Sequence, residues 1–178
     1  MTAQVILVNE QDEVTGAMDK MEAHLQAKLH RAFSIFVFNK QGEMLLQQRA
    51  EGKYHSGGLW TNACCSHPSP GEETAASASR RLHEEMGFHT PLVKIFDFTY
   101  RAELDNGLVE HEYDHVYLGI YNGDIHPNPD EVQSYRYVDM DELKHWLHER
   151  PDEFTAWFYI AFPLLEKWML KNKMELQN

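Results

Sequence analysis

The sequence has few cysteines, and the two it has are neighbours. Cys64 and Cys65 are the only cysteines among 178 residues. Adjacent cysteines can close a disulfide only as a strained small ring, so both are expected to be thiols in a reducing compartment. A chain of this length buries enough surface to fold without disulfides.

Basic residues are also scarce. Sixteen Lys and Arg stand against 28 Asp and Glu, which gives a formal net charge of −12. A protein that binds nucleic acid or an anionic membrane needs a basic face, so neither partner is expected. If the substrate is a small anion, local cations or metal ions must hold it.

Long apolar runs are absent as well. The most apolar window, 154–170, is interrupted by a proline and two charged residues and is too short to span a bilayer. Residues 1–14 show no basic region followed by an apolar stretch, so no signal peptide is predicted. Together with the reduced thiols, these features predict a cytoplasmic protein.

The chain has no repeats and no low-complexity stretch, which predicts a single domain over 1–178. The apolar patterns predict strands over 5–8, 32–38, 44–48, 93–102, 108–121 and 134–138 and helices over 73–86, 139–148 and 155–171. Gly87 provides the C-terminal stop of the first helix. Runs of strands with a few helices between them predict an α+β fold, in which helices sandwich a mixed sheet. The pattern leaves a monomer and a homodimer equally open.

Several of the eleven histidines have a spacing that suits a metal site. His24 and His30 flank a short segment that enters the strand over 32–38, where loop and strand-edge side chains can converge. Cys65 and His67 share one face of an extended segment, which suits two metal ligands or a reactive thiol beside a ligand. The alternative is that each histidine lies on the surface or makes a local hydrogen bond.

The strand over 108–121 carries two carboxylates on one face. Alternation places Glu110 and Glu112 together and His111 on the opposite face. Neighbouring carboxylates repel each other, and a shared cation would keep both ionised inside a protein. With the histidines they make a nitrogen and oxygen shell that suits zinc, manganese or iron rather than calcium. A solvated strand face is the alternative.

Charged residues upstream and downstream could hold a diphosphate. Arg49 and Lys53 lie close together in the sequence, and with Arg81 they could clamp phosphate oxygens. Taken alone they would be ordinary solvated charges, and Arg81 could instead form a surface ion pair with Glu85, one helical turn away. Trp157 is either a core aromatic or a stabiliser of a cation.

Residues 66–88 resemble the Nudix box, a loop, helix and loop that hold a divalent ion against a diphosphate. The matching positions are Glu72, Arg80, Glu84, Glu85 and Gly87. Two positions depart from the box, because Ser66 replaces its first glycine and Arg81 replaces a glutamate. A hydrolase that lacks one metal carboxylate should activate water poorly.

Further short motifs occur in a fixed order between about residues 5 and 157. They are Glu22-Ala23-His24, Leu29-His30-Arg31-Ala32-Phe33-Ser34, Leu59-Trp60-Thr61-Asn62, Cys64-Cys65-Ser66-His67-Pro68, Tyr100-Arg101-Ala102 and Glu110-His111-Glu112. With the altered Nudix box, this set resembles the type I isopentenyl-diphosphate isomerases. The resemblance implies a Nudix-like fold and the interconversion of isopentenyl diphosphate and dimethylallyl diphosphate by a 1,3-allylic proton shift.

The resemblance also implies roles for individual residues. It implies that Cys65 and Glu112 are the acid and base on opposite faces of the substrate, with Tyr100 assisting on the Glu112 side. It implies a zinc or manganese ion bound by His24, His30, His67, Glu110 and Glu112. Glu85 would hold a Mg²⁺ that bridges to the diphosphate, whose oxygens would contact Arg49, Lys53 and Arg81. Trp157 would lie over the hydrocarbon end.

Two other functions remain open from the sequence. One is a Nudix hydrolase that cleaves a diphosphate-linked nucleotide, against which Arg81 argues. The other is a non-catalytic metal-binding protein, in which the His and Cys cluster would form a closed structural site with four ligands. Five candidate ligands that include carboxylates favour a catalytic site instead.

Overall fold

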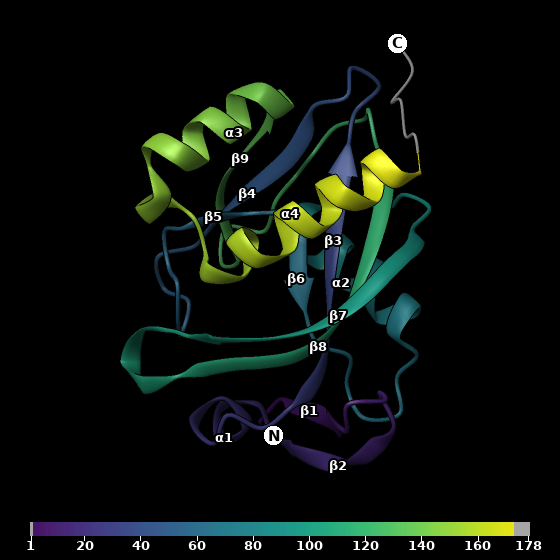
Figure 1. Cartoon of the computed structure of the whole chain (residues 1–178), viewed down its shortest axis with the longest axis vertical. Helices are drawn as coiled ribbons and strands as arrows, with labels where there is room; N and C mark the ends of the chain where they lie inside the picture. Colours follow the sequence, from purple (N-terminus) through teal and green to yellow (C-terminus); the bar gives the residue numbers. More distant parts are fainter. Residues whose placement is uncertain (1, 173–178) are drawn as a thin grey trace.

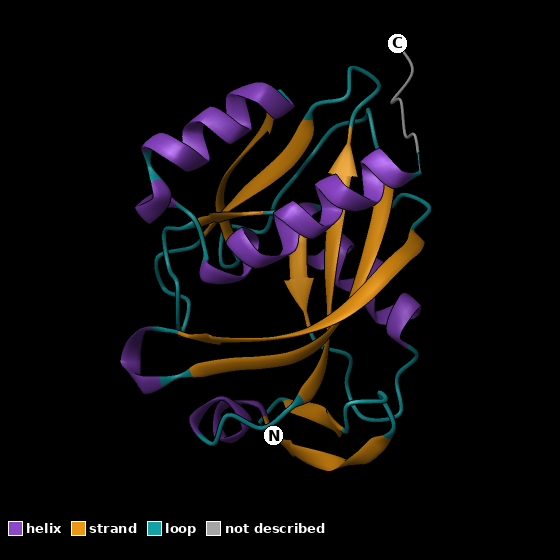
Figure 2. Cartoon of the chain, viewed as in Figure 1, coloured by secondary structure: helices purple, strands orange, loops and turns teal. Residues whose placement is uncertain are grey.

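A mixed β-sheet with helices on both faces makes up the body of the molecule (Figures 1 and 2). This computed structural model describes residues 2–172. In chain order the elements are β1 (Gln4–Val8), β2 (Val14–Asp19), α1 (Lys20–Leu25), β3 (His30–Phe38), β4 (Met44–Arg49), β5 (Trp60–Thr61), β6 (Cys64–Ser66), α2 (Thr74–Met86), β7 (Val93–Glu103), η1 (Asp105–Gly107), β8 (Val109–Ile120), β9 (Val132–Val138), α3 (Met140–Glu149), η2 (Pro151–Glu153) and α4 (Ala156–Lys171).

Strand β3 is the centre of the sheet. It pairs antiparallel with β1, β4 and β6 at different points along its length, and it runs parallel to β8. Strand β8 also forms a long antiparallel hairpin with β7, and β9 pairs with β4. Because β3 pairs with four other strands, it fixes the positions of those strands relative to one another.

Most residues of β3 are apolar, and successive side chains point to opposite faces of the sheet, so the strand contributes apolar residues to both faces. Ile35 belongs to the core cluster that contains Leu82 of α2. Phe36, one residue later, belongs to the cluster on the opposite face, with Phe158 of α4. A strand that is apolar on both faces must be covered on both faces, which explains why helices sandwich the sheet.

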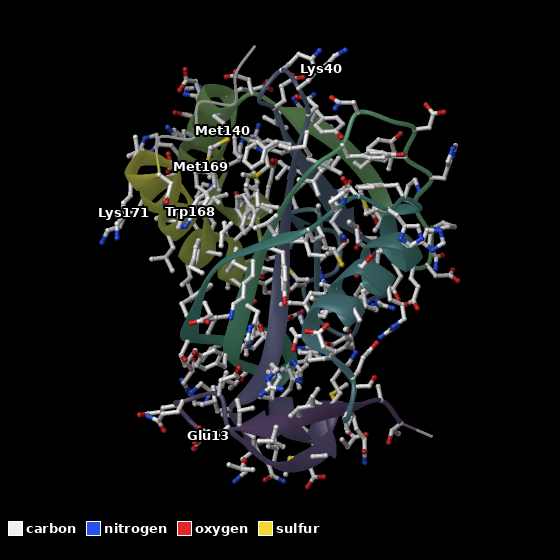
Figure 3. The ribbon with its side chains drawn as sticks, turned by 90° about the vertical axis from the view of Figure 1, so that its right-hand side faces the viewer. Glu13, Lys40, Met140, Trp168, Met169 and Lys171 are labelled. Atoms are coloured by element: carbon white, nitrogen blue, oxygen red, sulfur yellow. The ribbon has the colours of Figure 1, made fainter. Side chains whose placement is uncertain are left out.

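Helices α3 and α4 lie on the same face of the sheet and pack against each other. Figure 3 shows Met140, Trp168 and Met169 close together where the two helices meet, and all three pack against the second core cluster. Within residues 2–172, no helix is both long enough and apolar enough to cross a membrane.

The predicted α+β class, the six predicted strands and the three predicted helices are confirmed, with ends that differ by at most two residues. The structure adds β2, α1, β5 and β6, which the sequence patterns did not predict. Helix α1 has only six residues, too few for a helical period to show. His24, which the sequence patterns assigned to no element, lies in this helix.

Gly87 ends α2 in a left-handed conformation, as the sequence predicts, with φ of 78°. A Cβ atom at this position would lie 2.2 Å from the backbone oxygen of His126. Gly71 has a similar φ of +81°, but a Cβ atom there would meet nothing within 4 Å. Gly71 therefore requires only a left-handed backbone conformation, whereas Gly87 requires that conformation and also leaves no room for a Cβ atom.

We expect Gly87→Ala to destabilise the protein more than Gly71→Ala. Gly71→Ala should cost about 1 kcal/mol, because an L-residue is strained at positive φ. Gly87→Ala adds a backbone clash that the chain can relieve only by moving, which should add roughly 1–3 kcal/mol. Urea unfolding of both variants measures the difference. Equal losses of stability would show that the contact with His126 does not constrain the turn.

Candidate active site

One pocket gathers side chains from α1, the end of β4 and the loop after it, β6 and the residue after it, α2, β8 and the start of α4. Nine residues that the sequence analysis singled out line it, namely Arg49, Lys53, Cys65, His67, Arg81, Glu85, Glu110, Glu112 and Trp157. Of the remaining three, His24 and His30 lie directly behind the pocket in contact with its carboxylates, and Tyr100 contacts Glu112. The fold therefore brings all the candidate residues together.

Three histidines and a glutamate form a cluster that could hold a metal ion. His24, His30, His67 and Glu110 each offer one ligand atom, and these atoms lie within 4.8 Å of one another. His24 comes from α1, His30 begins β3, and Glu110 lies on β8. The cluster therefore joins elements that are far apart in the sequence.

Backbone contacts prepare two of these rings for a metal. Nδ1 of His24 lies 2.6 Å from the Lys20 carbonyl oxygen, and Nδ1 of His30 lies 2.8 Å from that of Lys28. Since a carbonyl can only accept, each Nδ1 carries a proton, which leaves Nε2 of each ring as the atom that could bind a metal. Among residues 2–172, His30 Nε2 and Glu110 Oε2 are buried atoms without a hydrogen-bond partner. The donor set therefore suits a divalent metal ion.

The charge states of His67 and Glu110 agree with this interpretation, whereas burial lowers the pKa of His24 but contacts with Glu110 outweigh it and leave that pKa raised, so a metal would have to displace a proton from this ring. Burial lowers the pKa of His67 to about 4, so its ring is neutral near pH 7. Burial would raise the pKa of Glu110, but contacts from His24 and His55 outweigh it and hold the pKa well below its usual range. A neutral imidazole and an ionised carboxylate are the forms that bind metals.

Glu112 lies between the metal cluster and a tyrosine. Its Oε2 is 2.7 Å from His67 Nε2 and 3.4 Å from His30 Nε2, and its Oε1 accepts a hydrogen bond from the Tyr100 hydroxyl. Burial and the charge of Glu110 would raise its pKa, but two histidines outweigh them and leave it lowered. Glu112 and Glu110 are both buried on one face of β8, so the predicted alternation is confirmed.

Cys65 faces the same pocket from β6. Its Sγ donates to Asn62 Oδ1 at 3.1 Å and lies 3.6 Å from Ser34 Oγ. Burial raises the pKa of Cys65 to about 12, so the thiol is protonated at neutral pH. The neighbouring Cys64 lies in the core under α2, with its Sγ 2.9 Å from Glu85 Oε2.

Positive side chains line the opposite wall. Lys53 pairs with Glu131, and Arg81 lies 2.6 Å from Glu84, 3.4 Å from Glu85 and 3.6 Å from Glu131. Glu85 is buried, so the interpretation of its pair with Arg81 as a surface ion pair is wrong. The guanidinium of Arg81 therefore contacts carboxylates from α2 and from the segment just before β9.

Comparisons with known proteins agree with these features. The model of the NUDIX domain matches residues 28–158. An isopentenyl-diphosphate Delta-isomerase from Pectobacterium atrosepticum is 56% identical over 140 residues, which cover 79% of this chain and 78% of the relative. One from Serratia proteamaculans is 50% identical over 143 residues, which cover 80% of this chain and 80% of the relative. The chain belongs to the isopentenyl-diphosphate Delta-isomerase family.

Solved structures confirm the fold of this family member. A Deinococcus radiodurans protein aligns with a TM-score of 0.70 over 82% of this chain and 89% of its own, at 18% identity. A MutT protein from Methanosarcina mazei aligns with a TM-score of 0.63 over 82% of this chain and 96% of its own, at 20% identity. At such identities the similarity concerns the fold alone.

Three pocket residues of this isomerase-family chain were missed by sequence reasoning. Lys20, Tyr54 and His55 line the pocket. Lys20 begins the short helix α1, and its ammonium lies 4.4 Å from the centre of the Tyr54 ring. Tyr54 and His55 follow Lys53 in a loop, where residue spacing does not predict which way a side chain points. His55 follows Lys53 by two residues in the sequence, and this closeness to a candidate cation was a signal that could have indicated it.

We expect Cys65 to react slowly with iodoacetamide in the metal-free protein at pH 8. The thiolate is the nucleophile, and a pKa near 12 in place of 9.0 lowers the thiolate fraction about a thousandfold. The rate should keep rising with pH up to about 11. Mass spectrometry of the labelled protein follows the reaction, with urea-unfolded protein as the control. Labelling as fast as in the unfolded chain would contradict the raised pKa.

Proposed function

We propose that this pocket interconverts isopentenyl diphosphate and dimethylallyl diphosphate, with Cys65 and Glu112 as the acid and base. One observation carries the proposal: a protonated thiol and an ionised carboxylate line the same pocket as a set of cations and an indole. The membership of the chain in the isomerase family supports it.

The chemistry of an allylic proton shift fits this pair. Moving the double bond requires a proton to be added at one carbon and removed from another, which an acid and a base can do together. The raised pKa of Cys65 keeps its proton available, and the lowered pKa of Glu112 keeps its carboxylate ready to accept one. The hydroxyl of Tyr100, which contacts Glu112 Oε1, assists proton movement on that side.

Protonating an alkene produces a tertiary cation that water would trap, so the site must exclude water. Trp157 is only 4% exposed, and its ring faces the pocket beside His55, with ring centres 5.6 Å apart. An aromatic face stabilises a cation without attacking it. Trp157 therefore covers the hydrocarbon end of the substrate.

The cationic wall holds the diphosphate. Arg49, Lys53 and Arg81 supply charge on one side, and Lys20 adds a fourth cation from α1. Burial and the cations Lys53 and Arg81 lower the pKa of Lys20, which is the effect expected where an anion would complete the site. Glu85 would hold a Mg²⁺ that comes with the substrate. The diphosphate stays attached throughout, so these groups position it rather than cleave it.

The His and Glu cluster takes zinc or manganese in this proposal. His24, His30, His67, Glu110 and Glu112 are the residues that would bind it. When bound, the ion supplies positive charge that keeps neighbouring carboxylates ionised. The protein residues orient the substrate, move its protons and exclude water.

We expect the purified protein to incorporate deuterium into isopentenyl diphosphate in D₂O with Mg²⁺, and to form dimethylallyl diphosphate. Cys65→Ala should lose roughly 10²- to 10⁴-fold in rate, the usual contribution of a general acid. Cys64→Ser, which replaces the neighbouring thiol on the other side of the strand and keeps a donor for Glu85 Oε2, should keep the exchange. Proton NMR follows both products. Untouched substrate, together with cleavage of diphosphate-linked nucleotides, would replace the isomerase with the Nudix hydrolase.

We also expect Lys20→Gln to lower kcat/KM for isopentenyl diphosphate at least about tenfold. A hydrogen bond to a charged group contributes roughly 1.5–3 kcal/mol, and the variant removes one from the diphosphate. Lys40→Gln is the matched control, because Lys40 is exposed at the opposite end of the molecule from α1 (Figure 3). Steady-state kinetics compare the two. Equal effects of both variants would exclude a direct contact by Lys20.

A further inference from the structure

His55 is a buried histidine of the pocket for which the proposed reaction has no role. It lies in the segment between β4 and β5 and is 3% exposed. Its Nε2 is 3.1 Å from Glu110 Oε1, although the N–H does not point straight at that oxygen. A neutral imidazole carries one ring proton, on either Nδ1 or Nε2.

The contact at the other ring nitrogen determines where that proton lies. Ser56 Oγ is 3.1 Å from His55 Nδ1, and a hydroxyl can donate to an imidazole lone pair. The proton is then on Nε2, facing the carboxylate of Glu110. The other tautomer would direct a lone pair at an ionised oxygen, which is repulsive.

His24 touches the same oxygen. Its Nε2 is 3.1 Å from Glu110 Oε1 and its Nδ1 is 2.6 Å from the Lys20 carbonyl, so in the metal-free protein both ring nitrogens face acceptors. A metal ion would take the Nε2 lone pair of His24. In that state His55 is the histidine that can donate to Glu110 Oε1, and Oε2 has no hydrogen-bond partner among residues 2–172 to compete with a metal.

The segment that carries His55 is held firmly. Ser56 has a φ of 53°, and its backbone N–H donates to Asp105 Oδ1 at the tip of the hairpin formed by β7 and β8. A Cβ atom on Gly57 would lie 2.5 Å from the carbonyl oxygen of Glu51. Arg49 donates to the carbonyl of His55 at 3.1 Å. The ring is therefore oriented by several separate contacts.

We propose that His55 is a positioning residue, which donates from Nε2 to Glu110 Oε1 and orients that carboxylate toward the metal site. The role rests on the proposed metal centre, and it concerns metal binding rather than proton transfer. A partner that orients a metal ligand typically accounts for a 10- to 100-fold change in metal affinity.

The test compares His55→Leu with His55→Gln. Leucine removes the N–H, whereas the glutamine amide can present one near the position of Nε2. Competition with a chelator measures the affinity for Zn²⁺ and Mn²⁺, and the visible spectrum of the Co²⁺ form reports the geometry of the ligands. We expect His55→Leu to bind metal 10- to 100-fold more weakly and His55→Gln to recover most of the loss. Circular dichroism and thermal unfolding check that each variant folds.

The exposed His126 supplies matched controls, because His126→Leu and His126→Gln make the same changes outside the pocket. Both should bind metal like the unmodified protein. Unchanged affinity in His55→Leu would overturn the proposal, and so would equal losses in His55→Leu and His55→Gln. If His55→Leu fails to fold, Ser56→Ala removes only the hydroxyl at Nδ1, and unchanged affinity in that variant would overturn the proposal.

The outcome separates this role from the proposed reaction. Metal affinity is measured without substrate, whereas the isomerase is tested by deuterium exchange with the unmodified protein. Weaker metal binding in His55→Leu would support the positioning role even if the unmodified protein exchanged no deuterium. Active exchange with unchanged metal affinity in His55→Leu would keep the reaction and remove the role.

Discussion

The parallel pairing of β3 with β8 is the constraint on which the site depends. Its register places His30 beside Glu112, and β7 adds Tyr100 opposite the same glutamate on the other edge of β8. Strand β6 pairs with β3 so that Cys65 lies opposite Ser34. Since side chains alternate along a strand, a slip of one residue would turn these groups to the other face. Backbone hydrogen bonds thus fix the distances between the proposed acid, base and metal ligands.

The carboxylates of β8 show how local partners decide the charge of buried groups. Glu110 and Glu112 face histidines and stay ionised. Asp114, the next residue on that face, receives a hydrogen bond from Ser34 at 2.7 Å, and burial and the charge of Glu112 raise its pKa well above the usual range. Three alternate positions on one strand therefore hold two carboxylates with a lowered pKa and one with a raised pKa. The difference follows from the side chains that β3 and the loops bring to each.

The sequence predicted the long periodic elements and most of the candidate site, because those residues lie in strands, a long helix or recognisable motifs. Alternation predicted that Glu110 and Glu112 share one face, which burial along β8 confirms, and the resemblance to the isomerases implied their roles. His55 and Lys20 could not be found in this way, since one lies in a loop and the other in a six-residue helix. Their directions depend on contacts with distant residues, such as the one between Ser56 and Asp105, which no local pattern encodes.

Helix α1 closes the site from the N-terminal end of the chain, and this has a consequence for folding. His24 and Glu110, which meet in the metal cluster, are separated by 86 positions in the sequence. Contacts of such high sequence separation form only after much chain entropy has been lost, so they belong to the late stages of folding. A fragment that lacks either end cannot assemble the cluster. Tight metal binding is therefore a direct report that the whole chain, from α1 to β8, has reached its native arrangement.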